Sequence, residues 1–321
     1  MSSSLLDQIR EQCAWVADQG LSVRINHDRI RPYAESLLDA SAAPAELDPA
    51  HHYVDHGPDT VAFILTLDTV NFGSGYFPHL RKRPGFSGYF TVASSLNDHF
   101  VEHGPLSAGQ LAGMTPQACA QLFRQEPLNE ISAELMALFA KALNDLGRLV
   151  LDRFDGSFVG LVEAAGESAE RLIEILSAMP FFRDVQPYKG REVTFYKRAQ
   201  LTAADLALAM RSEPAGRFRD LDRLTIFADN LVPHVLRMDG VLDYDADLLE
   251  RIERRQLIVS GSSEEIEIRA GAVHAVERIR EEFAGLGKSV TPVELDYLLW
   301  NRGQGMAYKA RPRHRCRCVF Y

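Results

Sequence analysis

The chain has 321 residues, of which 46% are hydrophobic and 25% charged, a composition typical of a globular protein with a sizeable core. Its net charge of -9 argues against a broad nucleic-acid-binding surface, which requires clustered lysine and arginine. The sequence contains no secretory signal peptide, no apolar run long enough to span a membrane, and four cysteines that form no disulfide framework. We therefore expect a cytoplasmic protein with reduced thiols and with neither a membrane nor a nucleic-acid partner.

Helical periodicity dominates the first half of the chain. Apolar stripes and capping residues predict helices over residues 5–17, 28–38, 59–69, 89–100, 115–124 and 130–154. The glycine-rich and aromatic stretch 71–78 (NFGSGYFP) lies between two of them. It matches no phosphate-binding loop, so it is either a simple turn or a loop that lies against a planar ligand.

The pattern changes near residue 183. Residues 183–186 and 192–196 predict two short strands joined around 187–190, which is a β-hairpin. Helices follow, with Thr202 expected to cap residues 203–210 and residues 291–294 (TPVE) forming a capping box with proline in the first turn. The fold is thus predicted to be mainly α with a small β-hairpin element. The chain lacks the alternating strands and helices of a Rossmann-type sheet. We expect 1–321 to form a single globular unit, or two packed lobes of about 1–155 and 156–321.

A carboxylate stands in the middle of the apolar stretch 224–236. Asp229 would be costly to bury unless another group pairs with it or the protein uses it. Pro233 cannot donate a hydrogen bond to the carbonyl of Asp229, so a helix must kink or restart here, with Asn230 as a suitable N-cap. Two interpretations stay open: Asp229 is either an ionised carboxylate with a chemical role or only a helix cap.

Two further groups suggest contacts with a ligand. Lys197 and Arg198 follow the predicted hairpin and lead towards the Asp229 segment, so either could contact a phosphate. Asp296 and Trp300 are four residues apart and share a helical face. A carboxylate beside an aromatic ring suits a flat ligand that is cationic or donates hydrogen bonds, although a core tryptophan near a helix-start aspartate is a common structural arrangement.

Several stretches together resemble the queuosine salvage proteins, which are queuosine 5'-phosphate N-glycosylases. They are residues 191–200 (REVTFYKRAQ), 224–229 (LTIFAD), 265–269 (EIEIR), 295–300 (LDYLLW) and 312–321 (PRHRCRCVFY). The resemblance covers nearly the whole chain and is strongest after residue 154. It implies a fold like that of helix-hairpin-helix DNA glycosylases and hydrolysis of queuosine 5'-monophosphate, which releases the base queuine for reuse in tRNA.

The resemblance also implies roles for particular residues. Asp229 falls on the catalytic aspartate of the family, and four residues fall in its base pocket: His51, Phe227, Asp296 and Tyr297. Asn301 stands where the family often has an acidic residue, and residues 73–75 (GSG) replace a more aromatic stretch. Both departures concern recognition of the base. Neither a cofactor nor a metal is implied.

Three rival functions deserve comparison. A DNA glycosylase would share the fold and the aspartate, but duplex binding requires a basic surface. A metal-dependent hydrolase could use His51, His52, Asp55 and His56, yet these residues lie in a predicted loop without helical ligand spacing. A non-catalytic nucleobase-binding module would bind queuosine monophosphate without converting it.

Overall fold

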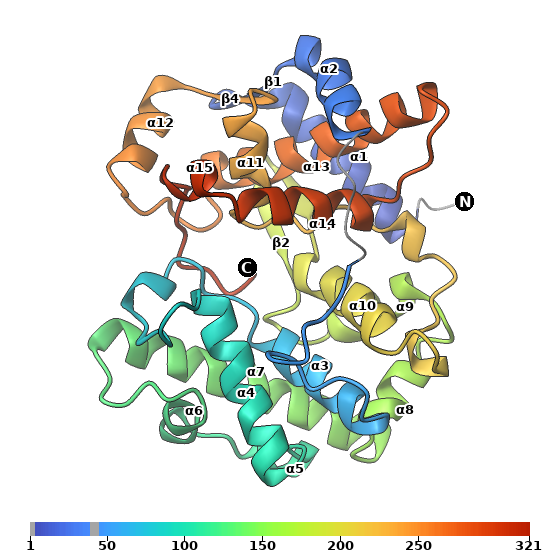
Figure 1. Cartoon of the computed structure of the whole chain (residues 1–321), viewed down its shortest axis with the longest axis vertical. Coiled ribbons are helices and arrows are strands. Elements are labelled where there is room, and N and C mark those ends of the chain that lie inside the picture. The colour runs from blue at the N-terminus through green and yellow to red at the C-terminus, as the bar shows by residue number, and fades with distance from the viewer. Residues whose placement is uncertain (1–3, 39–44) are drawn as a thin grey trace. The chain divides into compact units, whose positions relative to one another are not determined.

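The computed structural model describes residues 4–38 and 45–321, and it confirms a mainly helical fold (Figure 1). The chain divides into two compact units, each assembled from stretches that are separated in sequence. Unit 1 contains Met1–Ala45, Asp184–Lys197 and Asp222–Arg317, and unit 2 contains Glu46–Arg183, Arg198–Leu221 and Cys318–Tyr321. The organisation as one globular domain and the likeness to helix-hairpin-helix glycosylases stay predictions.

Unit 1 holds two small sheets and a group of helices. Its elements are α1 (Leu5–Gln19), β1 (Val23–Ile25), α2 (His27–Leu38), β2 (Val185–Tyr188), β3 (Arg191–Thr194), α11 (Val232–Met238), β4 (Leu242–Tyr244), α12 (Ala246–Glu253), α13 (Ser263–Gly285), α14 (Pro292–Gly303) and α15 (Met306–Lys309). Helix α13 is central, because α1, α2, α11, α14 and β1 all pack against it (Figure 1).

Helices α11 and α14 approach each other closely in unit 1. A side chain at Gly303 of α14 would collide with Leu231, since an added Cβ would lie 2.8 Å from Leu231 Cδ1. The predicted capping box of α14 is present, with Thr291 and Glu294 each accepting a hydrogen bond from the backbone N–H of the other. The start of α14 is therefore set locally, and its position is set by packing on α11.

The predicted hairpin is confirmed as β2 and β3, which pair from Val185 opposite Thr194 to Tyr188 opposite Arg191. Pro187 and Tyr188, predicted to lie in the turn, belong to β2. Lys189 and Gly190 form its two-residue turn, and both have positive φ, 45° and 79°. Positive φ at both turn residues matches the right-handed twist of antiparallel strands. The second sheet, β1 with β4, was not predicted, because two three-residue strands so distant in sequence leave no periodic pattern.

Unit 2 is built from helices. They are α3 (Pro58–Thr69), α4 (Gly88–His103), α5 (Ala108–Ala112), α6 (Pro116–Leu122), α7 (Glu130–Phe154), α8 (Phe158–Glu163), α9 (Ala169–Leu176) and α10 (Lys197–Ala209, whose first residue belongs to unit 1), with short 3-10 turns at Phe77–His79 and Pro214–Gly216. The long α7 packs against α3, α5, α6 and α8. No helix within the described ranges is long and apolar enough to cross a membrane.

One predicted cap is wrong. Thr202 does not begin a helix, because α10 already starts at Lys197, and the Thr202 hydroxyl donates to the carbonyl of Arg198 at 2.9 Å. Threonine in a helix interior often satisfies its hydroxyl in this way.

The glycine-rich loop 71–78 behaves as a turn: Phe72 and Tyr76 are buried, and the Gly73 N–H donates to the carbonyl of Tyr321.

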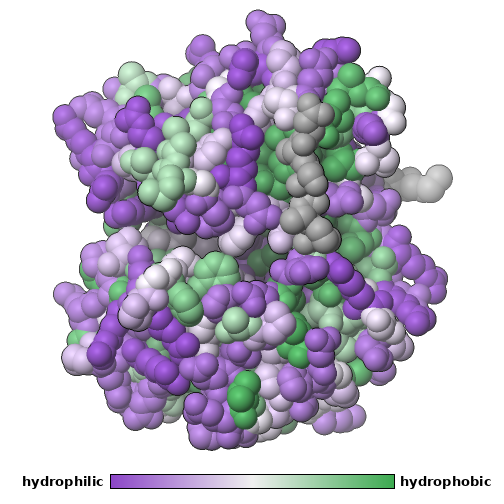
Figure 2. Space-filling view, viewed as in Figure 1, coloured by the Kyte–Doolittle hydropathy of each residue, from purple (hydrophilic) through white to green (hydrophobic). Residues whose placement is uncertain are grey.

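The face of the molecule seen in Figure 1 is covered largely by hydrophilic residues, with apolar residues in smaller areas among them (Figure 2). None of the four cysteines, all of which lie in the described ranges, forms a disulfide.

Candidate active site around Asp229

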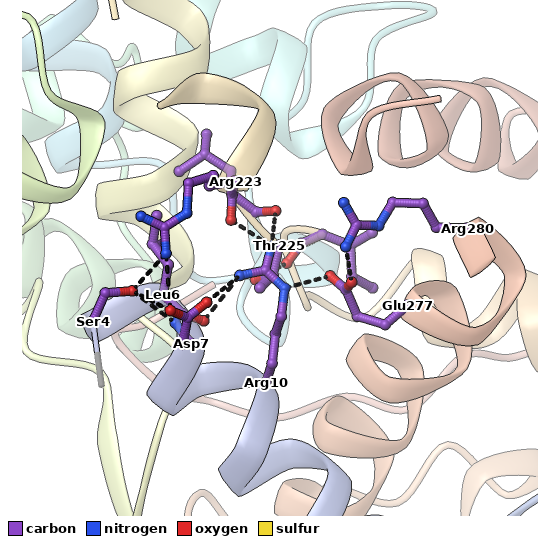
Figure 3. Close-up of polar contacts among 10 residues, drawn as sticks. Ser4, Leu6, Asp7, Arg10, Arg223, Thr225, Glu277 and Arg280 are labelled. Carbon is purple, nitrogen blue, oxygen red and sulfur yellow. Dashed lines mark hydrogen bonds and ion pairs between the residues drawn. The ribbon is translucent and has the colours of Figure 1, made fainter. Parts of the chain in front are cut away.

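The segment 224–231 is neither helix nor strand, although most of it is buried. Its buried backbone groups therefore need partners from elsewhere, because an unpaired buried N–H or C=O is costly. Arg10 of α1 supplies the first: its guanidinium donates to the carbonyls of Arg223 and Leu224, the latter at 2.9 Å. Arg10 is itself paired with Glu277 of α13, with Nε 3.1 Å from Oε1 (Figure 3). This anchors the start of the segment.

The middle of the segment is held by two more side chains. The backbone N–H of Phe227 donates to Oδ1 of Asp296 at 2.8 Å. The carbonyl of Ala228 accepts a hydrogen bond from Nε of Arg269 at 3.0 Å. The Ile226–Phe227 peptide is thus fixed by a group from α14, and the Ala228–Asp229 peptide by a group from α13.

Asp229 is half-buried and lies just before α11. Its Oδ1 accepts hydrogen bonds from the backbone N–H groups of Leu231 and Val232, at 2.6 and 3.1 Å. Within the described ranges no hydrogen bond reaches the other carboxylate oxygen, Oδ2. Asp229 thus holds the start of α11 although Leu231, and not Asp229, is the helix N-cap; this contact uses only one carboxylate oxygen and leaves the second available.

The predicted N-cap at Asn230 is wrong. Leu231 is the N-cap of α11, and the Asn230 side-chain amide instead donates to the carbonyl of His314 at 3.4 Å. No helix runs up to Asp229, so none restarts there. Pro233 lies in the first turn of α11, where the N–H that it lacks would have no helical partner in any case.

Asp296 is a second carboxyl group near Asp229. It is buried in α14, and its pKa is raised to about 8 by burial and by the negative charge of Asp229. The Phe227 N–H and the positive charge of Lys197 oppose this shift. Two carboxyl groups with unequal environments are a common arrangement in sites that transfer or withhold protons. At neutral pH the Asp296 carboxyl mainly retains its proton, so it can donate as well as accept a hydrogen bond.

The two cations proposed for phosphate binding are both buried, but their contacts differ. Lys197 lies in unit 1, where its charge acts on Asp296. Arg198 lies in unit 2 and is fully buried; its guanidinium donates to main-chain carbonyls of Asp68, Thr69, Phe181 and Val319 and packs on the rings of Phe72 and Phe182. A guanidinium so enclosed cannot reach a phosphate, so the prediction for Arg198 is wrong and Lys197 remains.

The other predicted pocket residues lie on α14, in the segment 224–231 and in unit 2. Tyr297 is half-buried and Asn301 exposed, and because they are four residues apart they share one face of α14. The Phe227 side chain is buried. His51 belongs to unit 2, where Nδ1 lies 2.9 Å from the Ser94 hydroxyl and the ring packs against Phe86 and Phe90. Its ring is therefore held in one orientation.

The histidine cluster does not resemble a metal site. Both ring nitrogens of His52 are occupied, Nδ1 by the carbonyl of Asp48 and Nε2 by the hydroxyl of Tyr89. The ring of His56 stacks on Tyr53 with centroids 3.8 Å apart. Across residues 4–38 and 45–321, no three His, Cys, Asp or Glu side chains gather where they could hold a metal ion.

Comparison with known proteins decides the family. Residues 51–321 match the family described as queuosine salvage protein. The chain belongs to this family. A Sphaerobacter thermophilus relative named queuosine 5'-phosphate N-glycosylase/hydrolase is 37% identical over 311 residues, which cover 95% of each chain. Relatives of the same name come from Mus musculus (30% identical; 97% of this chain and 98% of the relative) and Dictyostelium discoideum (31%; 98% and 99%).

In this queuosine salvage protein, sequence reasoning missed two arginines beside Asp229. Arg269 was noted only as part of the stretch 265–269. The spacing of Glu265 and Arg269, four residues apart in an apolar helix, could have predicted an ion pair there. Arg313 keeps exposed surface, yet the protein atoms around it lower the pKa of its guanidinium, a shift that the charge of Asp229 opposes. The alternating arginines of the C-terminal stretch indicated a group of cations, but the sequence did not show that Arg313 comes close to Asp229.

Proposed function

We propose that this protein hydrolyses the N-glycosidic bond of queuosine 5'-monophosphate and releases queuine, with Asp229 as the catalytic carboxylate. The observation that carries the proposal is a pair of unlike carboxyl groups: Asp229, on a segment fixed by side chains and with one oxygen available, and Asp296 of α14, which is buried and has a pKa of about 8. Relatives that match over nearly their full length and are named for this reaction support the choice of substrate.

The reaction needs a fixed negative charge at the sugar. Breaking the bond between C1' and the base builds positive charge on the sugar, and a carboxylate beneath C1' stabilises that charge or attacks it. The two backbone N–H groups that bind Oδ1 of Asp229 hold the carboxylate in place before the substrate arrives, so no rearrangement is required during the reaction. Oδ2 is the oxygen available to face the sugar.

The leaving base needs help of another kind. A 7-deazapurine has carbon at position 7, so protonation there cannot assist departure as it does in a purine. Assistance must reach other positions of the ring. Asp296, which mainly retains its proton at neutral pH, can donate a hydrogen bond to the base, and when ionised it can bind the secondary ammonium group of queuine. In this scheme Tyr297, Asn301 and Phe227 of unit 1 shape the base pocket, and Lys197 of the same unit binds the 5'-phosphate. The pocket role implied for His51 stays a prediction.

The test is direct. The purified protein is incubated with queuosine 5'-monophosphate, and free queuine is measured by chromatography and mass spectrometry, with guanosine 5'-monophosphate as a control for the base. We expect stoichiometric release of queuine and ribose 5-phosphate from the first substrate only. Binding of queuosine monophosphate without release would support the nucleobase-binding module. Release of bases from duplex DNA would support the DNA glycosylase.

Two further expectations concern the binding partners of the protein and the compartment in which it works. With a net charge of -9, we expect no appreciable affinity for duplex DNA at physiological salt. The four cysteines without disulfides support a reducing compartment such as the cytoplasm.

A further inference from the structure

Arg269 of α13 is fully buried, and charged or aromatic groups surround its guanidinium. Nη1 and Nη2 donate to the two carboxylate oxygens of Asp184, at 3.0 and 2.6 Å. Nη1 also lies 3.5 Å from Glu265, one helical turn earlier, and the Phe195 ring centroid is 4.0 Å from Cζ. Burying such an ion pair has a large desolvation cost, and apolar residues of similar volume often stabilise a protein equally well. Stability alone is therefore a weak reason for this arrangement.

The two ends of the ion pair contact the backbone beside two proposed site residues. Nε of Arg269 donates to the Ala228 carbonyl, which belongs to the peptide that joins Ala228 to Asp229. On the other side, Oδ2 of Asp184 accepts the backbone N–H of Lys197 at 3.2 Å. The Asp184 carbonyl also accepts the N–H of Phe195 at 2.9 Å. One buried ion pair thus connects the peptides that carry Asp229 and Lys197.

The geometry of arginine makes this connection stiff. A guanidinium is planar, and its two terminal nitrogens bind both oxygens of one carboxylate while Nε points to a third acceptor. The plane of the Ala228–Asp229 peptide is therefore tied to the plane of the Arg269 side chain. Since the segment has no helical or strand hydrogen bonds of its own, rotation of this peptide would move the Asp229 carboxylate directly.

We propose that Asp184 and Arg269 are positioning residues for hydrolysis, which hold the Asp229 carboxylate and Lys197 in one fixed relative geometry. The inference rests on the proposed function, in which Asp229 acts at C1' of the sugar. Neither Asp184 nor Arg269 contacts the substrate in this scheme. Their effect is on the rate of the chemical step, because misplacing a catalytic group by about 1 Å can lower a rate roughly 10²-fold.

Arg269→Lys and Asp184→Asn test the proposal. Lysine keeps the charge but has a single nitrogen, so it cannot reproduce the two Nη contacts with Asp184 together with the Nε contact to the Ala228 carbonyl. We expect single-turnover hydrolysis per folded molecule to fall about 10- to 100-fold in each variant, while KM changes less than about threefold. The double variant should be no slower than the slower single variant, because both changes remove the same constraint.

Glu267→Gln is the matched control. Glu267 lies on the same helix and is also buried, and its carboxylate accepts the N–H groups of Leu21, Ser22 and Val23 and the hydroxyl of Tyr188. Its contacts lie at β1 and β2, away from the Asp229 segment. We expect this variant to melt at a lower temperature than the parent and to hydrolyse at the parental rate once the folded fraction is accounted for.

The possible results distinguish a failure of the positioning role from a failure of the proposed function. If Arg269→Lys does not fold, Asp184→Asn decides, because Glu265 still provides a counter-charge to Arg269 in that variant. Parental rates in the folded variants, or an equal loss of rate in Glu267→Gln, would overturn the positioning role alone. A parent protein that releases no queuine, or an Asp229→Asn variant as active as the parent, would overturn the proposed function and the positioning role with it.

Discussion

Replacing Asp229 with asparagine separates its two roles. The Asp229 Oδ1 accepts hydrogen bonds from the N–H groups of Leu231 and Val232, and an asparagine carbonyl can accept both. Asparagine also caps helices about as well as aspartate. The substitution therefore keeps the shape and the start of α11 and removes only the negative charge.

The expected loss of hydrolysis rate in Asp229→Asn follows from the removal of that charge. If Asp229 stabilises a cationic sugar, its loss should cost about 3–4 kcal/mol of transition-state stabilisation, which is roughly 10²–10³-fold in rate. Stability should change little or rise, because the charge of Asp229 also raises the pKa of Asp296 and the two groups repel each other when both are ionised. A pure cap would instead show a parental rate.

The assay pairs thermal melting with single-turnover hydrolysis of queuosine 5'-monophosphate. Asp245→Asn serves as the control, because Asp245 caps α12 by accepting the N–H of Leu248 at 2.7 Å and plays no part in the proposed chemistry. We expect both variants to fold and only Asp229→Asn to lose turnover. A folded Asp229→Asn protein with the parental rate would refute the catalytic role and leave Asp229 as a capping residue.

Three other outcomes are expected. The pKa of Asp296 is about 8 in the folded protein and about 3.9 in the unfolded chain, so between pH 4 and pH 8 this carboxyl group is protonated in the folded state and ionised in the unfolded state. The free energy of unfolding therefore falls with rising pH over this window, by at most about 1.4 kcal/mol per pH unit. Urea titrations of Asp296→Asn should show a flatter dependence over this window; an identical pH dependence would contradict the raised pKa. Lys197→Met should lower kcat/KM for the monophosphate and leave the slower reaction of the nucleoside nearly unchanged; if both fall equally, Arg313 is the next cation to test as the phosphate ligand. Hydrolysis should survive dialysis against a chelator, and activity that disappears and returns with zinc or magnesium would contradict a metal-free reaction.

Local signals in the sequence were enough to predict much of the fold. The capping box at residues 291–294 and the hairpin joined near Gly190 depend only on neighbouring residues, so they can be predicted without knowing the rest of the chain. The same holds for Asp229, since a carboxylate in an apolar stretch close to a proline is unusual in any context. The resemblance of several stretches to one family supplied the expected reaction.

Only the tertiary structure decided which polar groups are buried and what they contact. Lys197 and Arg198 are adjacent in sequence, yet Arg198 is enclosed by main-chain carbonyls and Lys197 acts on Asp296. Asp296 meets the backbone of Phe227 across 69 residues of sequence, and Arg269 meets Ala228 across 41. Desolvation and charge coupling depend on how distant segments fold together. The local pattern could therefore propose Asp229, but it could not show that side chains from α1, α13 and α14 hold the backbone of the segment before it.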